Sequence, residues 1–317
     1  FTGTVGVIIG APIAVLIMSI FSPETVGGAG FDAVWRGLST IAGSWIGGGA
    51  NQAAMLEVFK FNQEKYGAMV LVDIVVANIW MAFLLFGIGK KEKIDKWLKA
   101  DNRSIEELKE KVTAYADNVT RNPSLTDLMV ILGIAFTAVG LSHWGSNSIS
   151  DFLKANFEIV NDPTSFASTF GDRFFWMVTI ATALGIAFSF TKLKEYEGAG
   201  ASKIGSVFIY ILVASIGMKM DLGSVMSNPG LLVVGLIWMA IHVLLLVIVA
   251  KIIKAPYFFL AVGSKANIGG AASAPIVASA FHPSLASVGV LLAVFGYVIG
   301  TYGALLAAFL MEIAAPK

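Results

Sequence analysis

Long hydrophobic runs alternate with short polar loops along most of the chain, and this pattern predicts membrane-spanning helices. The hydrocarbon core of a bilayer is about 30 Å thick, so a spanning helix needs about 20 mostly apolar residues. Nine segments approach this length: Thr2–Ile20, Val34–Val58, Tyr66–Ile88, Leu125–His143, Arg173–Phe190, Lys203–Met220, Leu231–Ile252, Tyr257–Ala280 and Leu285–Met311. They predict an all-α polytopic membrane protein that is embedded in the lipid bilayer.

One stretch departs from this pattern. Residues 90–121 are strongly charged, and six apolar residues recur there at helical spacing: Ile94, Trp97, Leu98, Ile105, Leu108 and Val112. This spacing predicts one or two amphipathic helices at the membrane surface. The stretch is either a regulatory or domain-coupling arm or a solvated connector, and its high charge favours the connector.

Two of the predicted spans contain nearly the same phrase. Residues 43–52 read GSWIGGGANQ and residues 263–273 read GSKANIGGAAS. Glycine costs about 1 kcal/mol relative to Ala inside a helix, so runs of glycine favour a break. In a membrane, unwound backbone is tolerated only where it is buried in protein or lines an aqueous cavity. A broken segment repeated in two halves of a chain is typical of the binding site of a transporter.

Close helix packing is the alternative reason for glycine in membrane segments, because small residues let backbones approach. We expect this packing role for the glycines of the first and last spans: Gly3, Gly6, Gly10, Gly296, Gly300 and Gly303. The repeated phrases differ, since amide and hydroxyl side chains accompany their glycines. They predict two broken helices that present polar groups at mid-membrane.

Each phrase is the middle of three spans in the same order, which predicts an internal repeat. The predicted parts are a first repeat at 1–88 with its broken segment at 34–58, a charged surface linker at 89–124, a connecting helix and loop at 125–171, and a second repeat at 172–317 with its broken segment at 257–280. Two more spans precede the second triplet, so we expect at least two helices before Phe1. Inverted triplets that each cross three times need an even number of spans between them, whereas the pattern gives three. The side of the membrane that residue 62 faces would decide this.

Two charged residues lie inside predicted spans, where a charge is costly and usually faces the bundle interior or a cavity. The carboxylate of Asp73 can bind Na⁺ or carry a proton, and Lys265 can replace a cation or hold an anionic substrate. A structural pair for Asp73 and snorkelling of Lys265 to a segment end are the alternatives. The predicted substrate and ion site comprises Ser44, Gly47, Gly48, Asn51, Gln52, Asp73, Asn78, Ser264, Lys265, Asn267, Gly269, Gly270 and Ser273. Asp73, Asn51 and Asn267 are the candidate Na⁺ ligands, and no other cofactor is expected.

Composition agrees with a membrane protein and excludes several functions. Hydrophobic residues make up 56% of the 317 and charged residues 14%, with a mean hydropathy of +0.78, whereas soluble domains have roughly 25% charged residues. A net charge of +1 argues against a nucleic-acid partner. The absence of cysteine excludes disulfides and thiolate chemistry. No His-Glu-x-x-His, Gly-x-Gly-Asp or serine-elbow motif is present, so we do not expect an enzyme.

Basic residues in the loops predict an orientation. Lys and Arg cluster at 90–121, at Lys192–Lys203 and at Lys251–Lys254, which predicts that these loops are cytoplasmic. The span count then places the C-terminus inside as well. The predicted location is the bacterial inner (cytoplasmic) membrane, with multiple passes.

Three phrases together resemble a known family over essentially the whole chain. They are the ANIGG at 266–270 followed by Ala274-Pro275, the earlier GSWIGGGAN, and Gly296-Tyr297 with Gly300-Thr301-Tyr302. They resemble the YjcL-like family, or domain of unknown function 819, which is similar to the cation:proton antiporter and anion transporter superfamily. That superfamily includes NhaA-type Na⁺/H⁺ antiporters, bile-acid symporters and the sodium/glutamate symporter.

The resemblance implies an inverted-repeat transporter fold with two discontinuous helices that cross at mid-membrane. It also implies five helices in each repeat, a core domain that moves against a scaffold domain, and a homodimer. Asp73 would match the helix that carries an ion-binding carboxylate in the antiporters. The chain departs from that pattern in two ways: it has one acidic residue there instead of an Asp-Asp pair, and Lys265 occupies a place where a neutral polar residue is expected.

Our leading functional hypothesis is a secondary active transporter of a small organic solute, an anion or an amino-acid-like carboxylate. Alternating access would couple its movement to Na⁺ or H⁺. The alternative is a cation/proton antiporter with Asp73 as the carrier, and a more remote one is a passive channel, which the two glycine breaks disfavour.

Overall fold

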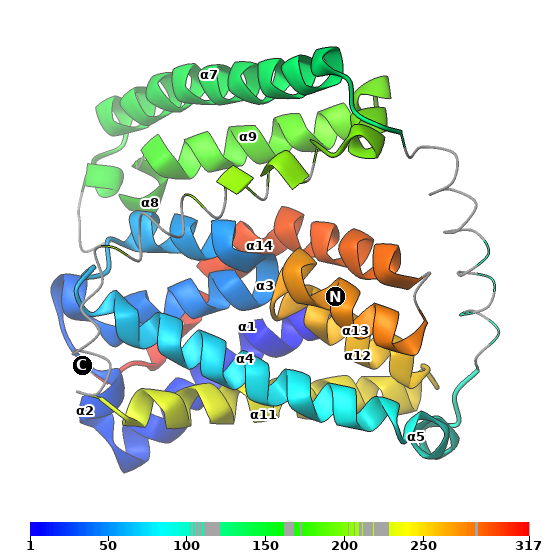
Figure 1. Cartoon of the computed structure of the whole chain (residues 1–317). Coiled ribbons are helices and arrows are strands. Elements are labelled where there is room, and N and C mark those ends of the chain that lie inside the picture. The colour runs from blue at the N-terminus through cyan, green and yellow to red at the C-terminus, as the bar shows by residue number, and fades with distance from the viewer. Residues whose placement is uncertain are drawn as a thin grey trace. The chain divides into compact units, whose positions relative to one another are not determined.

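The described part of the chain is almost entirely helical in the computed structural model (Figure 1). The structure describes residues 1–101, 103, 105, 107, 110, 121–161, 168–171, 173–201, 203–205, 207–208, 211, 218, 228–282 and 285–316. This part contains no strand, and its helices are α1 (Thr2–Phe21), α2 (Pro23–Val26), η1 (Gly30–Asp32), α3 (Val34–Phe59), α4 (Tyr66–Ile88), α5 (Lys91–Leu98), α7 (Leu125–Asn156), η2 (Glu158–Asn161), α8 (Ser168–Gly171), α9 (Arg173–Ser189), η3 (Lys192–Ala199), α11 (Gly230–Ile252), α12 (Tyr257–Asn267), α13 (Gly270–Phe281) and α14 (Ala286–Ala314). The predicted all-α fold class is confirmed.

Two compact units divide the chain. The first comprises Phe1–Thr113 and Ile216–Lys317, and the second comprises Ala114–Ser215. In the second unit, α7 packs along α9. Both repeated phrases and both charged residues of the predicted site lie in the first unit. The predicted boundaries at residues 88, 124 and 171 delimit the parts of an internal repeat and not compact units. The division into two units therefore does not test them, and they stay predictions.

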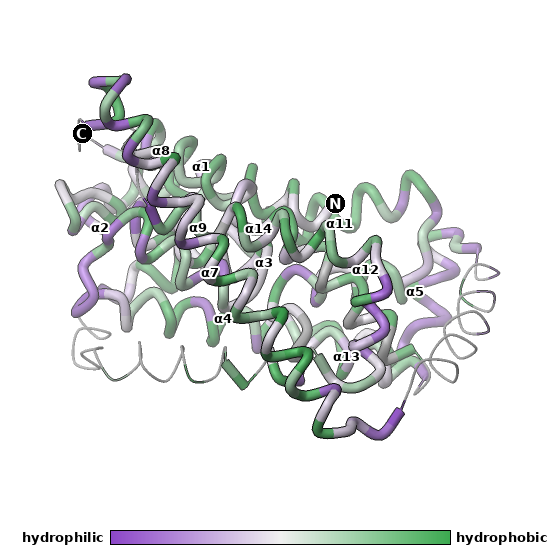
Figure 2. The backbone as a smooth tube through the Cα atoms, turned by 90° about the horizontal axis from the view of Figure 1, so that it is seen from above, coloured by the Kyte–Doolittle hydropathy of each residue, from purple (hydrophilic) through white to green (hydrophobic). Residues whose placement is uncertain are grey.

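Five helices among the described residues are long and apolar enough to cross a membrane: α1, α4, α7, α11 and most of α14. The bent pair of α9 and η3 makes a sixth if it counts as one span. The sequence predicts nine spans, which is three more than these six. Two of the three are α3 and the pair of α12 and α13. The third is the predicted span at 203–220, and most of its residues lie outside the described part of the chain. A multi-pass membrane protein is confirmed. Figure 2 shows hydrophobic residues along the long helices and hydrophilic ones around α2 and α5.

Glycines bring α1 and α11 close together. A Cβ atom on Gly6 would lie 3.2 Å from the backbone of His242, and one on Gly10 would lie 2.7 Å from the Trp238 ring. The indole nitrogen of Trp238 donates to the carbonyl oxygen of Val7 at 2.8 Å. These contacts confirm the predicted packing role of Gly6 and Gly10. Along the contact the residue numbers of α11 fall as those of α1 rise, so the two helices are antiparallel.

The long helices define two ends of the first unit. At the α5 end, where α4 and α11 finish, the Tyr257 hydroxyl donates to the Leu84 carbonyl at 2.8 Å. At the α2 end, where α1 and α14 finish, the Ser19 hydroxyl lies 3.5 Å from the Ala314 carbonyl. Lys251 is at the α5 end, since it donates to the Trp97 carbonyl of α5. The C-terminus therefore lies at the opposite end from Lys251, which corrects the prediction that they share one side.

Helix α3 is a hairpin rather than a straight span. It breaks at Gly48, where φ is 76° and ψ is −175°, a conformation that only glycine adopts readily. The chain then returns to its starting point. Arg36 Nη1 donates to the Phe59 carbonyl at 2.7 Å, and the rings of Trp35 and Phe59 lie 5.3 Å apart. Both arms of α3 therefore open at the α2 end.

The loops that flank α3 are tied together at this end. Lys65 forms a 2.9 Å ion pair with Asp32, and Asn62 Nδ2 donates to the same carboxylate at 2.8 Å. These hydrogen bonds, first from Lys65 and then from Asn62, hold the pKa of Asp32 below its ordinary value. Asp32 is therefore ionised at neutral pH, and it joins the loop before α3 to the loop after it.

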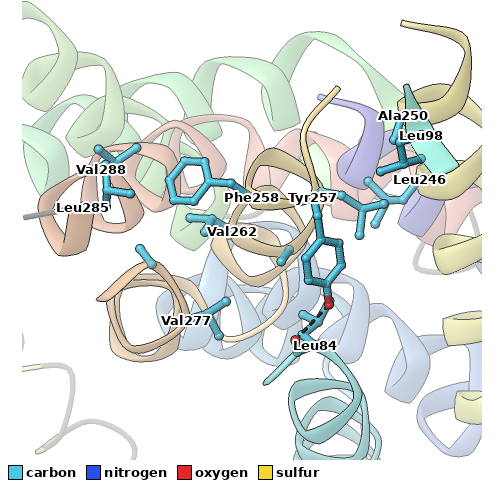
Figure 3. Close-up of a cluster of buried hydrophobic side chains, with 13 residues drawn as sticks. Leu84, Leu98, Leu246, Ala250, Tyr257, Phe258, Val262, Val277, Leu285 and Val288 are labelled. Atoms are coloured by element: carbon cyan, nitrogen blue, oxygen red, sulfur yellow. Dashed lines mark hydrogen bonds between the residues drawn. The ribbon is translucent and has the colours of Figure 1, made fainter. Parts of the chain in front are cut away.

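A second hairpin, formed by α12 and α13, opens at the α5 end. Between its arms, Gly269 and Gly270 adopt φ values of 104° and 56°. The ring of Phe281, the last residue of α13, lies 5.3 Å from that of Phe258 at the start of α12. Figure 3 shows the buried hydrophobic cluster that surrounds Tyr257 and Phe258.

Both breaks thus occur at glycines of the repeated phrases, as predicted. The structure corrects the expectation that each broken segment runs from one face to the other. α3 enters from the α2 end, α12 and α13 enter from the α5 end, and each hairpin returns to the end where it began.

Helix α5 packs against the start of the second hairpin. Its Leu98 belongs to the cluster of Figure 3. Its Ile94 is half-buried and packs against that cluster. Asp95 Oδ1 accepts a 2.7 Å hydrogen bond from the backbone N–H of Tyr257, the first residue of α12. α5 thus packs its apolar residues Ile94 and Leu98 on the second hairpin and exposes most of its charged ones, as the predicted amphipathic helix would. The choice between a coupling arm and a solvated connector stays a prediction, and residues 111–120 lie outside the described residues.

The hairpin geometry predicts which loops share one side of the membrane. The chain has no cysteine, so single cysteines at the exposed residues Phe31, Gln63 and Lys93 can be labelled selectively. With a membrane-impermeant maleimide on vesicles of known orientation, Phe31→Cys and Gln63→Cys should react from the same side and Lys93→Cys from the other. Reaction of the first two variants from opposite sides would mean that α3 crosses the membrane.

Candidate functional site

Asp73 is the centre of a buried hydrogen-bond cluster. It lies in α4 with 9% of its surface exposed. Its Oδ2 accepts hydrogen bonds from Ser44 Oγ at 2.6 Å and Gln52 Nε2 at 3.1 Å, and its Oδ1 accepts one from Trp45 Nε1 at 2.7 Å. Ser44 and Trp45 precede the break at Gly48, whereas Gln52 follows it. The carboxylate therefore joins both arms of the α3 hairpin to α4.

Lys265 brings a positive charge to the same region. Its side chain is 2% exposed, and its Nζ donates to the carbonyl of Ala77, one turn after Asp73 on α4, at 3.4 Å. Asp73 and Lys265 interact electrostatically, but none of the ion pairs among the described residues joins them. The structure brings the two predicted charges into one region without direct contact.

The tips of the two hairpins meet in the middle of the first unit. Asn267 Nδ2 donates to Thr4 Oγ1 at 2.9 Å and lies 3.4 Å from the Ile46 carbonyl in the other hairpin. The side chain of Tyr297 in α14 lies against both breaks, since a Cβ atom on Gly48 would lie 2.8 Å from its Cε1 and one on Gly270 would lie 2.9 Å from its hydroxyl.

Close packing of α14 stabilises the tip of the first hairpin. A Cβ atom on Gly300 would lie 2.6 Å from the Cα atom of Gly47. Asn51 Nδ2 donates to the Gly47 carbonyl at 2.7 Å, and Thr301 Oγ1 donates to Asn51 Oδ1 at 2.6 Å. The predicted packing role of Gly300 is confirmed. The amide of Asn51 thus donates one hydrogen bond and accepts one within the packed tip, and its role as a Na⁺ ligand stays a prediction.

A series of hydrogen bonds around Ser264 of α12 links four helices. His242 Nδ1 lies 3.0 Å from the carbonyl of Gly3, which can only accept, so Nδ1 carries the proton. A neutral His242 then accepts at Nε2 from the hydroxyl of Ser264 at 2.9 Å. Ser264 Oγ in turn accepts from Trp80 Nε1 at 2.8 Å. With this tautomer, the Trp80 N–H, the Ser264 hydroxyl and both ring nitrogens of His242 all have partners. These hydrogen bonds fix α12 against α1, α4 and α11.

Removing the Ser264 hydroxyl should therefore destabilise the protein. A Ser264→Ala variant leaves the Trp80 N–H and His242 Nε2 without partners, and we expect a loss of about 2 kcal/mol in unfolding free energy. Thermal unfolding of the purified protein in detergent measures this. Ser279→Ala is the matched control, because Ser279 Oγ donates only to the Ile276 carbonyl of its own helix. Equal stability of the two variants would contradict the inferred hydrogen bonds of Ser264 with Trp80 and His242.

One predicted site residue lies elsewhere. Asn78 is exposed and its Nδ2 donates to the Ile74 carbonyl of its own helix at 2.8 Å. Five residues at about 100° each place it about 140° around α4 from Asp73. Conversely, the sequence predicts only an aromatic-belt or packing role for Trp45 and Trp80, and it predicts no site role for His242. Their signal was available, since an indole or imidazole in the middle of an apolar segment needs a hydrogen-bond partner.

The site has no cluster that resembles a transition-metal centre. Among the described residues, no group of three or more His, Asp or Glu side chains could hold a metal ion together. A cavity of about 160 Å³ extends from Ile253 at the α5 end to Asn267 at the tips. A second cavity of about 260 Å³ adjoins Asn267 and Gly296. The hairpin tips are thus bordered by space as well as by packed helices.

Comparison with known proteins gives a consistent result. The family model described as protein of unknown function (DUF819) matches residues 1–313. The chain is 27% identical over 310 residues to the uncharacterized membrane protein YjcL of Bacillus subtilis (strain 168), and this alignment covers 94% of the chain and 71% of that protein. No solved structure gives a significant match. With both hairpins inside the matched region and several helices apolar enough to cross a membrane, the chain belongs to the DUF819 family.

Proposed function

We propose that the protein is a secondary active transporter that moves a small organic anion by alternating access. The observation that carries this proposal is the meeting of two broken hairpins, which enter from opposite ends, beside the buried charges of Asp73 and Lys265. Broken helices offer free N–H and C=O groups at mid-membrane, which suits them to bind a substrate and a coupling ion. Close packing alone would not require buried charges there.

An inverted repeat is part of the proposal. α1 runs toward the α2 end, the α3 hairpin returns to that end, and α4 runs back. α11 runs toward the α5 end, the second hairpin returns to that end, and α14 runs back. These directions support two triplets of opposite orientation. Each triplet crosses only twice, so an odd number of spans must join them, and the three predicted spans satisfy this requirement.

The coupling ion is proposed to be Na⁺ or H⁺ and to act at Asp73. The indole N–H of Trp45 can only donate, so it occupies Oδ1 and leaves the Oδ2 side for a cation. Ser44 and Gln52 lie on that side and carry oxygen atoms that can turn toward Na⁺. A cation/proton antiporter with Asp73 as carrier is the second candidate, and it is favoured by the lack of a direct ion-pair partner for Asp73 among the described residues.

The proposed orientation places the α5 end in the cytoplasm. Basic residues are concentrated there, in α5 and at Lys251 and Lys254, and cytoplasmic loops are enriched in Lys and Arg. The α2 end and the C-terminus would then face outward. The protein would lie in a bacterial cytoplasmic membrane.

Uptake into proteoliposomes tests the function. Labelled small carboxylates and amino acids would be supplied with an inward Na⁺ gradient, with an inward proton gradient, or with neither. We expect one gradient to drive accumulation and its ionophore to abolish it. Uptake that only equilibrates and ignores both gradients would refute coupled transport, whereas cation/proton exchange without solute uptake would support the antiporter instead.

A further inference from the structure

Ser273 is unusual among the helical serines of this protein. A serine inside a helix commonly donates to a backbone carbonyl three or four residues earlier. Ser142 and Ser279 do so at 2.7 and 2.9 Å. The Oγ atom of Ser273, in the first turns of α13, is buried and has no hydrogen-bond partner among the described residues. A buried hydroxyl without a partner is costly and needs an explanation such as a ligand.

The neighbouring ammonium group is also under-satisfied. Lys265 Nζ has three N–H donors, and its hydrogen bond to the Ala77 carbonyl is long, at 3.4 Å. Gly269 lies between Lys265 and Ser273. A Cβ atom on Gly269 would overlap Ser273 Oγ and lie 3.2 Å from Lys265 Nζ. Both polar groups therefore lie directly against Gly269.

The N-terminus of α13 adds a third favourable element. This helix has 12 residues, and Gly269 at its N-cap provides no side-chain hydrogen bond to the first backbone N–H groups. Free N–H groups and the positive end of the helix dipole attract anions. Gly269 is exposed, so the two polar groups lie beside a residue that is reached from outside the packed core.

We propose that Lys265, Ser273 and the N-terminus of α13 bind the carboxylate group of a monoanionic solute. The inference rests on the proposed transport function and specifies its substrate class. Asp73 and Lys265 carry opposite charges, so the empty site is neutral. A bound monoanion and one coupling cation keep it neutral, whereas a dianion would leave a net charge within the membrane, which is costly. The same charge count predicts electroneutral uptake.

Ligand-dependent thermal stability tests the subsite in the purified protein. Acetate, propionate and benzoate would be compared with their uncharged amides and with the dianions succinate and sulfate. We expect at least one monocarboxylate to raise the unfolding temperature more than the amides and dianions do. Ser273→Ala should weaken its apparent affinity by about 10-fold without lowering the unfolding temperature in the absence of ligand, since Oγ has no protein partner. Lys265→Met should abolish the effect, and Ser279→Ala should behave as the wild type.

Three outcomes would overturn the subsite. They are no stabilisation by any monocarboxylate, wild-type affinity in Ser273→Ala, and a lower ligand-free stability of Ser273→Ala. The proposed function fails separately. Coupled uptake that ignores Ser273→Ala would retain the transporter and remove the subsite, whereas Ser273-dependent binding without coupled uptake would retain the subsite and remove the transporter.

Discussion

An Asp73→Asn variant is expected to lose gradient-driven uptake by about 10- to 100-fold, which is the effect of losing one or two hydrogen bonds to a charged group. The amide nitrogen that replaces one carboxylate oxygen would face donors, whether Ser44 and Gln52 or the Trp45 N–H. The variant should also be less stable, because Lys265 becomes a buried charge without a compensating negative charge, at a cost of about 1–3 kcal/mol.

The stability of a double variant separates these effects. Lys265→Met should be destabilising alone, but Asp73→Asn with Lys265→Met should be more stable than the sum of the single changes predicts, by about 1–3 kcal/mol. Thermal unfolding of the four proteins in detergent gives this coupling energy. Asp32→Asn with Lys65→Met is the matched control, since that ion pair is about half exposed and should give at most about 1 kcal/mol. Strictly additive changes at Asp73 and Lys265 would show that the buried charges act independently.

A Gly48→Ala variant is expected to damage the fold and the transport site together. The φ of 76° and ψ of −175° at Gly48 lie in a region that is almost restricted to glycine, and the new Cβ atom would lie 2.8 Å from Tyr297 Cε1. We expect a loss of about 2–4 kcal/mol in unfolding free energy, from backbone strain of about 1–3 kcal/mol and added steric overlap. Uptake should fall in parallel.

Gly263→Ala is the control for this prediction. Gly263 begins the second phrase, yet a Cβ atom there would meet no atom within 4 Å, and its φ is not positive. The change should be neutral or slightly stabilising, because Ala favours the helix by about 1 kcal/mol. A Gly48→Ala variant as stable as Gly263→Ala would mean that the α3 segment is not broken at Gly48.

The positions of the breaks could be predicted from sequence, but the course of the chain after them could not. Runs of glycine beside amides locate the breaks because helix propensity is a local property. Whether a broken segment continues or returns depends on contacts far along the chain, such as that of Trp35 with Phe59. A hairpin of two short apolar arms has the same length and composition as one span. For this reason the sequence pattern predicts α3 and the α12–α13 hairpin as spans.

The site was predicted in part for the same reason. Asp73 and Lys265 stand out because charges in apolar segments are rare, and the structure places them in one region. Asn78 was included for its nearness in sequence, although helical geometry alone places it on another face of α4. The hydrogen bonds from Trp80 through Ser264 to His242 join residues that lie up to 184 positions apart. No local sequence pattern predicts such long-range partners.

The contact between the two hairpin tips bears on whether solutes and ions can leak through the protein. Each hairpin separates the central site from only one end of the first unit, α3 from the α2 end and the second hairpin from the α5 end. The direct polar contact between the tips, from Asn267 to the Ile46 carbonyl, is weak at 3.4 Å. Displacing one hairpin would connect the site to one aqueous compartment while the other hairpin keeps the second compartment closed. Two independent gates built from one repeated phrase would suffice to move a solute without opening a continuous pore.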